Sequence, residues 1–142
     1  MKQFFFVLSF LAFGAMAAQA QAASGPVMTF EVTTVDYGKI EKGAEPVRHF
    51  KFTNTGNEPL MIKSAKASCG CTVPTYPMEP IMPGESANID VRYDTHRVGP
   101  FSKQVTLTTN ETEAAHTLTI KGDVKAPPTQ ESVPVSTGGL KQ

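Results

Sequence analysis

Two cysteines separated by one glycine, Cys69-Gly70-Cys71, are the residues of this sequence most able to do chemistry. On a straight strand, residues i and i+2 point to one face with their Cα atoms roughly 6.5 Å apart, near the upper limit for a disulfide. Closure of a disulfide therefore requires a bend, which Gly70 can supply. Such a tight ring is expected to be strained and easily reduced, so a redox or thiol-exchange role is one hypothesis.

The same pair of cysteines has two other interpretations. Two thiolates on one face would suit Cu(I), and further soft ligands could join Cys69 and Cys71 if the loops converge, namely Met78, Met82 and His96. A zinc site is disfavoured, because zinc prefers four ligands and the chain has three histidines. The third interpretation involves no chemistry: the cysteines are small packing groups or a local disulfide at the edge of the fold. The nearest preceding cation, Lys66, is interpreted as a solvated strand residue.

The remaining polar residues form no recognisable catalytic set, so we expect a protein that is not an enzyme. No serine or carboxylate stands at a triad spacing from a histidine, and the three histidines are expected at the surface or the edge of the core: His49, His96 and His116. Asp90 and Asp94 alternate with Arg92, which indicates a solvated charge pattern on a strand. The triplet Asn110-Glu111-Thr112 matches an N-glycosylation acceptor, a match that is common by chance.

A period of two in the apolar residues predicts strands. The clearest runs over residues 87–94, where alternate residues from Ala87 to Tyr93 are apolar and those between them are polar. Similar patterns predict strands at Phe50 and Phe52, from Leu60, from Phe101 to Leu107, and at Leu118 and Ile120, with opening strands at Met28, Phe30, Val32, Val35 and, after a Tyr37-Gly38 turn, Ile40. The proline-rich segment 78–84 is expected to be an edge or crossover loop that leads into a Pro-Gly turn.

Six to eight short strands in some 100 residues predict an all-β fold, an immunoglobulin-like antiparallel β-sandwich of about seven strands. All 16 threonines lie beyond residue 22, which suits pleated and half-exposed surfaces. The chain has no tryptophan, and its two cysteines are too close together to join two sheets in the antibody manner. The core must therefore rest on aliphatic side chains and on five aromatic ones: Phe30, Phe50, Phe52, Tyr93 and Phe101.

The first 22 residues are predicted to be a cleaved signal peptide. A basic start at Lys2 precedes an apolar run from Phe4 to Ala18, and small residues follow at two possible cleavage sites, Ala18-Gln19-Ala20 and Ala20-Gln21-Ala22. The apolar run is shorter than a membrane span, so no span is expected after cleavage. We therefore expect an exported protein, periplasmic or extracellular, whose cysteines meet an oxidising compartment.

Composition divides the rest of the chain into a domain over residues 27–125 and a tail. Residues 126–142 are rich in Pro, Ser and Gly and are expected to be a disordered extension. The whole chain carries 13 basic and 13 acidic residues. This balance gives no basic field for nucleic acid and no acidic tail.

Several motifs together resemble the bacterial "domain of unknown function 1573" family. They cover about residues 29–122: an opening Asp36-Tyr37-Gly38, the Phe50-x-Phe52-x-Asn54-Thr55-Gly56 string with Pro59-Leu60-x-Ile62, Ser68-Cys69-Gly70-Cys71-Thr72, Pro80-Ile81-x-Pro83-Gly84, Val91-x-Tyr93, and Gly99-Pro100-Phe101-x-Lys103. The resemblance implies an immunoglobulin-like sandwich related to the Hydin and major-sperm-protein group, often exported. It brings no established activity.

Two functional hypotheses follow. The first is an exported, non-enzymatic binding or structural module of the cell envelope, with a protein or glycan partner and no cofactor. The alternative is a small thiol-redox or copper-binding periplasmic protein that uses Cys69 and Cys71.

Overall fold

A computed structural model describes residues 24–128 of the chain. The predicted signal peptide, residues 1–22, and most of the predicted disordered tail, residues 129–142, lie outside the described residues. Within the described part there is no helix with the length and apolar character needed to cross a membrane.

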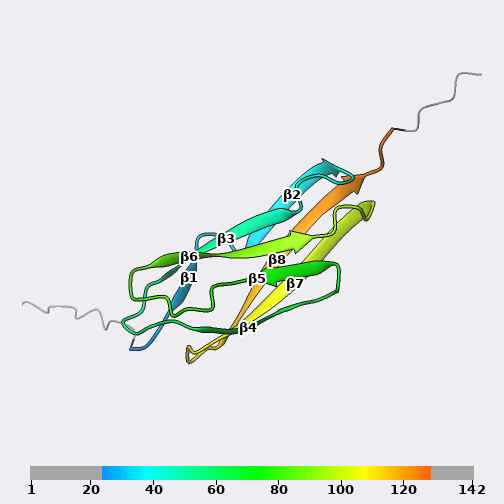
Figure 1. Ribbon diagram of the computed structural model, residues 1–142. Coiled ribbons are helices and arrows are strands. Elements are labelled where there is room, and N and C mark those ends of the chain that lie inside the picture. Colours follow the sequence, from blue (N-terminus) through cyan, green and yellow to red (C-terminus); the bar gives the residue numbers. More distant parts are fainter. Residues whose placement is uncertain (1–23, 129–142) are drawn as a thin grey trace, which may run out of the picture.

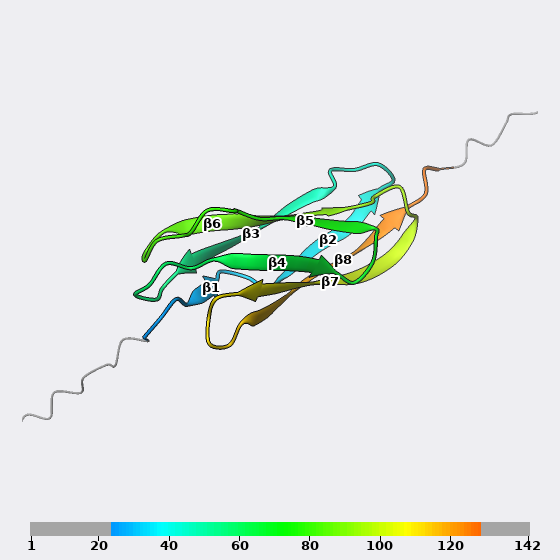
Figure 2. The ribbon, with the colours of Figure 1, turned by 60° about the horizontal axis from the view of Figure 1, so that its bottom comes forward.

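Eight strands and no helix make up the described residues, so the prediction of an all-β fold is confirmed (Figure 1). In chain order they are β1 (Met28–Phe30), β2 (Thr34–Glu41), β3 (Val47–Asn54), β4 (Ile62–Ala67), β5 (Thr72–Thr75), β6 (Ser86–Tyr93), β7 (Gly99–Thr109) and β8 (Ala115–Lys125). They form two four-stranded sheets, one in the order β1-β3-β6-β5 and the other in the order β2-β8-β7-β4. Figure 2 shows the two sheets packed face to face as an elongated sandwich.

The strand order is that of an immunoglobulin-type sandwich with one strand added. A constant-type domain has a four-stranded and a three-stranded sheet. Here β2 extends the second sheet by pairing with β8, and this pair is parallel. The predicted immunoglobulin-like antiparallel sandwich is therefore confirmed, with β2 and β8 as its one parallel pair, while the other strand pairs of residues 24–128 are antiparallel.

The predicted turn at Tyr37-Gly38 is wrong, because both residues lie inside the continuous strand β2. The pairing of β2 with β8 is interrupted between Asp36 and Lys39 and then resumes. Gly38 has a positive φ of 67°, and its N–H donates to the Asp36 side chain at 2.8 Å. The local pattern is turn-like, but it forms a β-bulge that lets the strand continue along β8.

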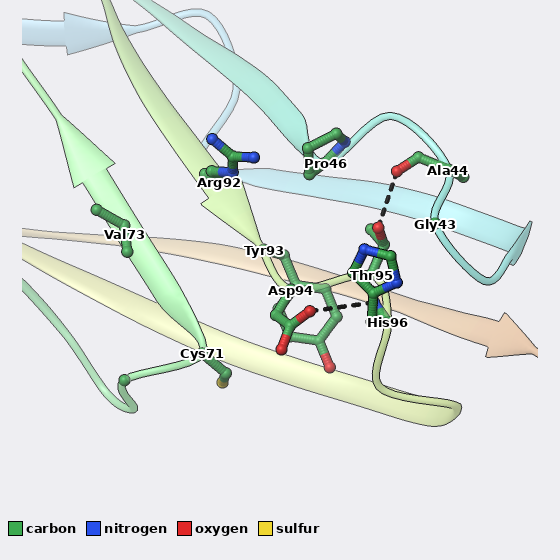
Figure 3. Close-up of a pocket in the computed structure, with 11 residues that line it drawn as sticks. Gly43, Ala44, Pro46, Cys71, Val73, Arg92, Tyr93, Asp94, Thr95 and His96 are labelled. Atoms are coloured by element: carbon green, nitrogen blue, oxygen red, sulfur yellow. Dashed lines mark hydrogen bonds between the residues drawn. The ribbon is translucent and has the colours of Figure 1, made fainter.

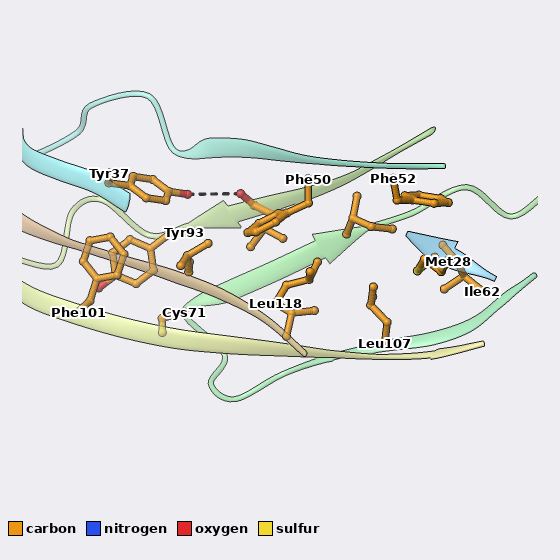
Figure 4. Packing of buried hydrophobic residues seen from close by; sticks show 14 of the residues in the cluster. Met28, Tyr37, Phe50, Phe52, Ile62, Cys71, Tyr93, Phe101, Leu107 and Leu118 are labelled. Carbon is orange, nitrogen blue, oxygen red and sulfur yellow. Dashed lines mark hydrogen bonds between the residues drawn. The ribbon is translucent and has the colours of Figure 1, made fainter. Parts of the chain in front are cut away.

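The core lies between the sheets, and the rings of Tyr37, Tyr93 and Phe101 gather at one of its ends (Figure 4). Phe50 and Phe52 are also fully buried in it. At one end Phe101 stacks on Tyr93 at a centroid distance of 3.8 Å and meets Tyr37 edge-on at 5.3 Å. The Tyr37 hydroxyl donates to the Pro46 carbonyl at 2.8 Å, which ties β2 of one sheet to the segment that enters β3 of the other. Tyr37 was not among the predicted core aromatics.

The end of the sandwich that contains the loops around residues 54–60, 81–85 and 110–114 is here called the closed end. Its centre is Asn54, which has no exposed surface. The Asn54 amide accepts from the N–H groups of Val27 and Gly56 and donates to the carbonyls of Glu58 and Ile81. Four backbone groups from three segments are thereby satisfied by one side chain, which fixes the loops at this end.

Candidate functional site

The Cys69-Gly70-Cys71 motif forms the turn between β4 and β5, at the other end of the sandwich. The two sulfurs are joined in a disulfide, and the Cα atoms lie 5.3 Å apart. The chain bends here instead of running straight, as the sequence argument required for closure. Because β4 and β5 belong to different sheets, this turn joins the edges of the two sheets.

Two donors surround the sulfur of Cys69. The Cys71 N–H donates to Cys69 Sγ at 3.3 Å. The Thr72 hydroxyl lies 3.6 Å from Cys69 Sγ and 3.8 Å from Cys71 Sγ, so it can donate to one or the other. Cys71 is 8% exposed, whereas Cys69 is only partly buried. The two sulfurs therefore have unequal surroundings.

A pocket of about 370 Å³ opens beside the disulfide turn (Figure 3). Three parts of the chain that are distant in the sequence line it: the loop from Gly43 to Pro46, the turn and strand from Gly70 to Val73, and the segment from Arg92 to His96. We call this end of the sandwich the pocket end. Its volume is within the range of small-molecule and side-chain binding sites, roughly 300–1,000 Å³.

Hydrogen bonds of the backbone and of two side chains hold the pocket walls together. The Asp94 N–H donates to the Cys71 carbonyl at 2.9 Å, which joins the disulfide turn to the segment after β6. The Thr95 hydroxyl donates to the Ala44 carbonyl at 2.8 Å, and the Gly43 N–H donates to the Thr95 carbonyl at 3.1 Å. The Asp94 carboxylate accepts the His96 N–H at 3.1 Å. The pocket is therefore preformed by its own chain.

The pocket combines charged groups with an apolar rim. Among residues 24–128, the Arg92 guanidinium and the His96 ring form no hydrogen bond or ion pair, whereas Asp94 pairs with Arg97 at 3.4 Å. Val73 lines the pocket and is 56% exposed. In the sequence, Arg92 and Asp94 indicate only a solvated charge pattern, and the polar run 94–97 after a strand is the available signal for a loop site.

Burial raises the pKa of both tyrosines at this end. For Tyr37 burial raises the pKa to about 12, against an opposing effect of the Arg48 guanidinium, which lies 4.0 Å above its ring. Burial also raises the pKa of the Tyr93 phenol, and Arg97 acts against it. Both phenols are therefore neutral at physiological pH and act as packing groups with a hydroxyl at one edge.

Of the three proposed extra copper ligands, Met82 lies far from the cysteines and Met78 does not line the pocket beside them. The Met82 N–H donates to the Glu85 carboxylate just before β6 begins, whereas Cys71 bonds to Asp94 just after β6 ends. An eight-residue strand separates the two places, a length of roughly 25 Å. Met78 is exposed on the loop that precedes Met82. Only His96 lines the same pocket as Cys71, so Cu(I) binding by Cys69 and Cys71 stays a prediction.

The other predicted polar residues lie away from the pocket. His49 is exposed on β3 and contacts the Asp90 carboxylate at 2.7 Å across the strand pair. His116 lies at the edge of the core, 5.8 Å from the Phe30 ring, and contacts the Glu111 carboxylate at 2.6 Å. Asn110 is exposed in the β7–β8 hairpin, where its side chain bonds to the backbone of Pro59 and Met61. Within residues 24–128, no group of three or more His, Cys, Asp or Glu side chains could hold a metal ion.

The two sheets, their strand order and the loop pocket define the class of protein: an immunoglobulin-like β-sandwich domain. Within that class the chain belongs to the family described as "Protein of unknown function (DUF1573)", whose model matches residues 28–124. No curated protein matches the chain.

Solved structures resemble the fold at low sequence identity. A protein of unknown function from Porphyromonas gingivalis has a TM-score of 0.61 and 18% identity, over 74% of this chain and 50% of that one. A PapD-like domain of human CEP192 has a TM-score of 0.54 and 7% identity, over 70% and 84%. The secreted serine protease VesC from Vibrio cholerae has a TM-score of 0.54 and 12% identity, over 68% and 23%. This chain thus spans only a quarter to a half of the first and third of these, and the likeness concerns the fold.

Proposed function

We propose that this protein is an exported, non-enzymatic binding module of the bacterial cell envelope that receives a protein partner at its pocket end. The observation that carries the proposal is the preformed pocket with two polar side chains, Arg92 and His96, that have no partner within residues 24–128. Polar groups that a fold does not use for itself are available to a ligand.

The rim of the pocket favours a protein partner over a glycan. Val73 is 56% exposed and lines the pocket, and Val98, in the segment after His96, is 54% exposed. An apolar rim around charged groups is the surface that a loop or side chain of another protein can cover.

Export is supported by the sequence and by the state of the cysteines. The first 22 residues have the pattern of a signal peptide. A disulfide between Cys69 and Cys71 persists in an oxidising compartment such as the periplasm or the cell exterior.

The proposal is tested by partner capture from the envelope fraction of the organism that carries this chain. The bait is the chain from residue 23 onward, with three forms compared: the unchanged chain, Arg92→Ala with His96→Ala, and the control His49→Ala. His49 is a matched control because it is an exposed histidine on β3 that does not line the pocket. The proposal expects a protein that the unchanged chain and the control both retain and the pocket variant loses.

Two results would count against this function. A protein retained equally by the pocket variant would place the binding surface elsewhere. Retention of glycan fragments alone, lost in the pocket variant, would keep the site but replace the protein partner by a sugar.

A further inference from the structure

The disulfide turn has features that a purely structural disulfide does not require. Cys69 is only partly buried, while Cys71 is 8% exposed and faces the core. The Cys71 N–H donates to Cys69 Sγ at 3.3 Å, and the Thr72 hydroxyl lies within donating distance of both sulfurs, 3.6 Å from Cys69 Sγ and 3.8 Å from Cys71 Sγ. Donors of this kind stabilise a thiolate, because hydrogen bonds to the charged form favour it.

The turn also lies at the edge of the pocket, so a bound protein would approach it. Gly70 and Cys71 line the pocket directly. Gly70 is exposed, and a side chain there would meet nothing within 4 Å. The approach to the disulfide along Gly70 is therefore open.

We propose that this disulfide exchanges electrons with a cysteine pair on a partner protein, and that Cys69 is the sulfur that forms the mixed disulfide. This activity goes beyond binding. Cys71 is then the internal partner that leaves when the disulfide opens and attacks when it closes again.

The reductive step balances as follows. A thiolate of a dithiol partner attacks Cys69 Sγ, the Cys69–Cys71 bond breaks, and its electron pair leaves on Cys71 Sγ, which takes up a proton. The second partner thiol, deprotonated, attacks the partner sulfur of the mixed disulfide and releases Cys69 as a thiolate. The partner is oxidised to a disulfide, and this chain gains two electrons. The reverse sequence oxidises Cys69 and Cys71 and reduces the partner's disulfide.

The two hydrogen-bond donors lie beside Cys69, the sulfur that carries the negative charge in the proposed exchange. Cys69 is the thiolate released at the end of reduction and the nucleophile at the start of the reverse reaction. The Cys71 N–H and the Thr72 hydroxyl would stabilise it in both. Thr72 is buried, so its hydroxyl has little access to competing water.

The site of exchange is measured on the unchanged chain, so that no substitution can disturb the fold. The oxidised chain is mixed with reduced glutathione, quenched in acid at short times, digested, and the glutathione adduct is located by mass spectrometry. We expect the adduct on Cys69 at about tenfold excess over Cys71, since attack follows access to the sulfur. An adduct mainly on Cys71, or no opening of the disulfide by excess glutathione, would overturn the proposal.

The role of the hydroxyl is tested with Thr72→Val, which keeps the shape and removes the donor. The reduced variant is expected to react more slowly at Cys69 with oxidised glutathione, and the pH at which its rate is half maximal is expected to rise. The control is Thr75→Val, on the same strand but exposed. Equal rates and equal pH profiles for all three chains would remove the hydroxyl from the mechanism. A change in the control as large as that in Thr72→Val would do the same.

Discussion

The two ends of the sandwich differ in whether their polar side chains are hydrogen-bonded within the fold. At the closed end, the buried Asn54 amide satisfies four backbone groups, and the Glu111 carboxylate accepts from the Met28 N–H, the Thr109 hydroxyl and the His116 ring. At the pocket end, Arg92 and His96 point to solvent with no partner among residues 24–128. The first arrangement stabilises the fold. The second leaves groups available for a ligand, and it lies beside the disulfide.

The largest effect is expected from Asn54→Ala at the closed end. The substitution leaves the Val27 and Gly56 N–H groups and the Glu58 carbonyl without this partner, whereas the Ile81 carbonyl still accepts the Leu60 N–H. Each buried unpaired group costs about 1–3 kcal/mol. We expect a loss of about 4 kcal/mol in the free energy of unfolding, measured with urea. A loss below about 1 kcal/mol would show that water replaces the Asn54 amide easily and that this side chain does not fix the loops of the closed end.

Two glycine substitutions compare the ends directly. A Cβ at Gly56 would collide with the Gly25 carbonyl and lie 2.5 Å from the Val27 nitrogen, so Gly56→Ala must displace the backbone before β1. We expect a loss of about 2 kcal/mol, typical of overpacking. Gly70→Ala meets nothing within 4 Å, and its effect should stay within about 0.5 kcal/mol. If the two substitutions lowered the free energy of unfolding equally, in thermal or urea unfolding, the proposed difference between the two ends would be contradicted.

Tyr37→Phe tests the pocket end through the pH dependence of the free energy of unfolding. Burial raises the folded-state pKa of Tyr37 from 10.0 to about 12, so the folded state holds this proton more tightly than the unfolded state. Its contribution is complete below pH 10 and is lost as the pH rises towards 12. The variant should be about 1 kcal/mol less stable at neutral pH, through the lost bond to Pro46, and should lose less stability than the unchanged chain above pH 10.

Urea unfolding at a series of pH values checks this prediction. Tyr93 remains in the variant with a pKa that burial also raises, so some alkaline sensitivity should persist. Parallel stability curves for the two chains above pH 10 would contradict the assignment to Tyr37.

The smallest effect on stability is expected from His96→Ala. The ring forms no hydrogen bond within the described residues and lies beside Gly43, so its removal should change the free energy of unfolding by less than about 0.5 kcal/mol. The variant should nevertheless reduce partner retention. Clear destabilisation in urea would mean that His96 serves the fold and not a ligand.

The sequence predicted the fold well because its signals are local. The alternation of apolar and polar residues predicts strand β6, and it also predicts that Phe50, Phe52 and Phe101 are buried. The parallel pairing of β2 with β8 joins segments more than 80 residues apart, and no local period reports it. The bulge at Gly38 was interpreted as a turn because a bulge and a turn share the same local chemistry.

The site was harder to predict than the fold. The spacing of Cys69 and Cys71 shows that a disulfide needs a bend, but not that the Cys71 N–H would donate to Cys69 Sγ or that the Thr72 hydroxyl would lie beside both sulfurs. Likewise Asn54 was a turn residue in the sequence and proved to be a buried hydrogen-bonding centre. Arg92 and His96 line one pocket together with the loop around Gly43, and this contact between distant segments is not encoded locally in the sequence.

Site-specific photocrosslinking in the living cell tests the central claim most directly. A photoreactive residue replaces Val73, which lines the pocket and is exposed, or the exposed Thr112 at the tip of the closed-end hairpin. We expect a crosslinked protein from position 73 and none from position 112. Crosslinks from position 112 alone, or equally from both positions, would contradict it.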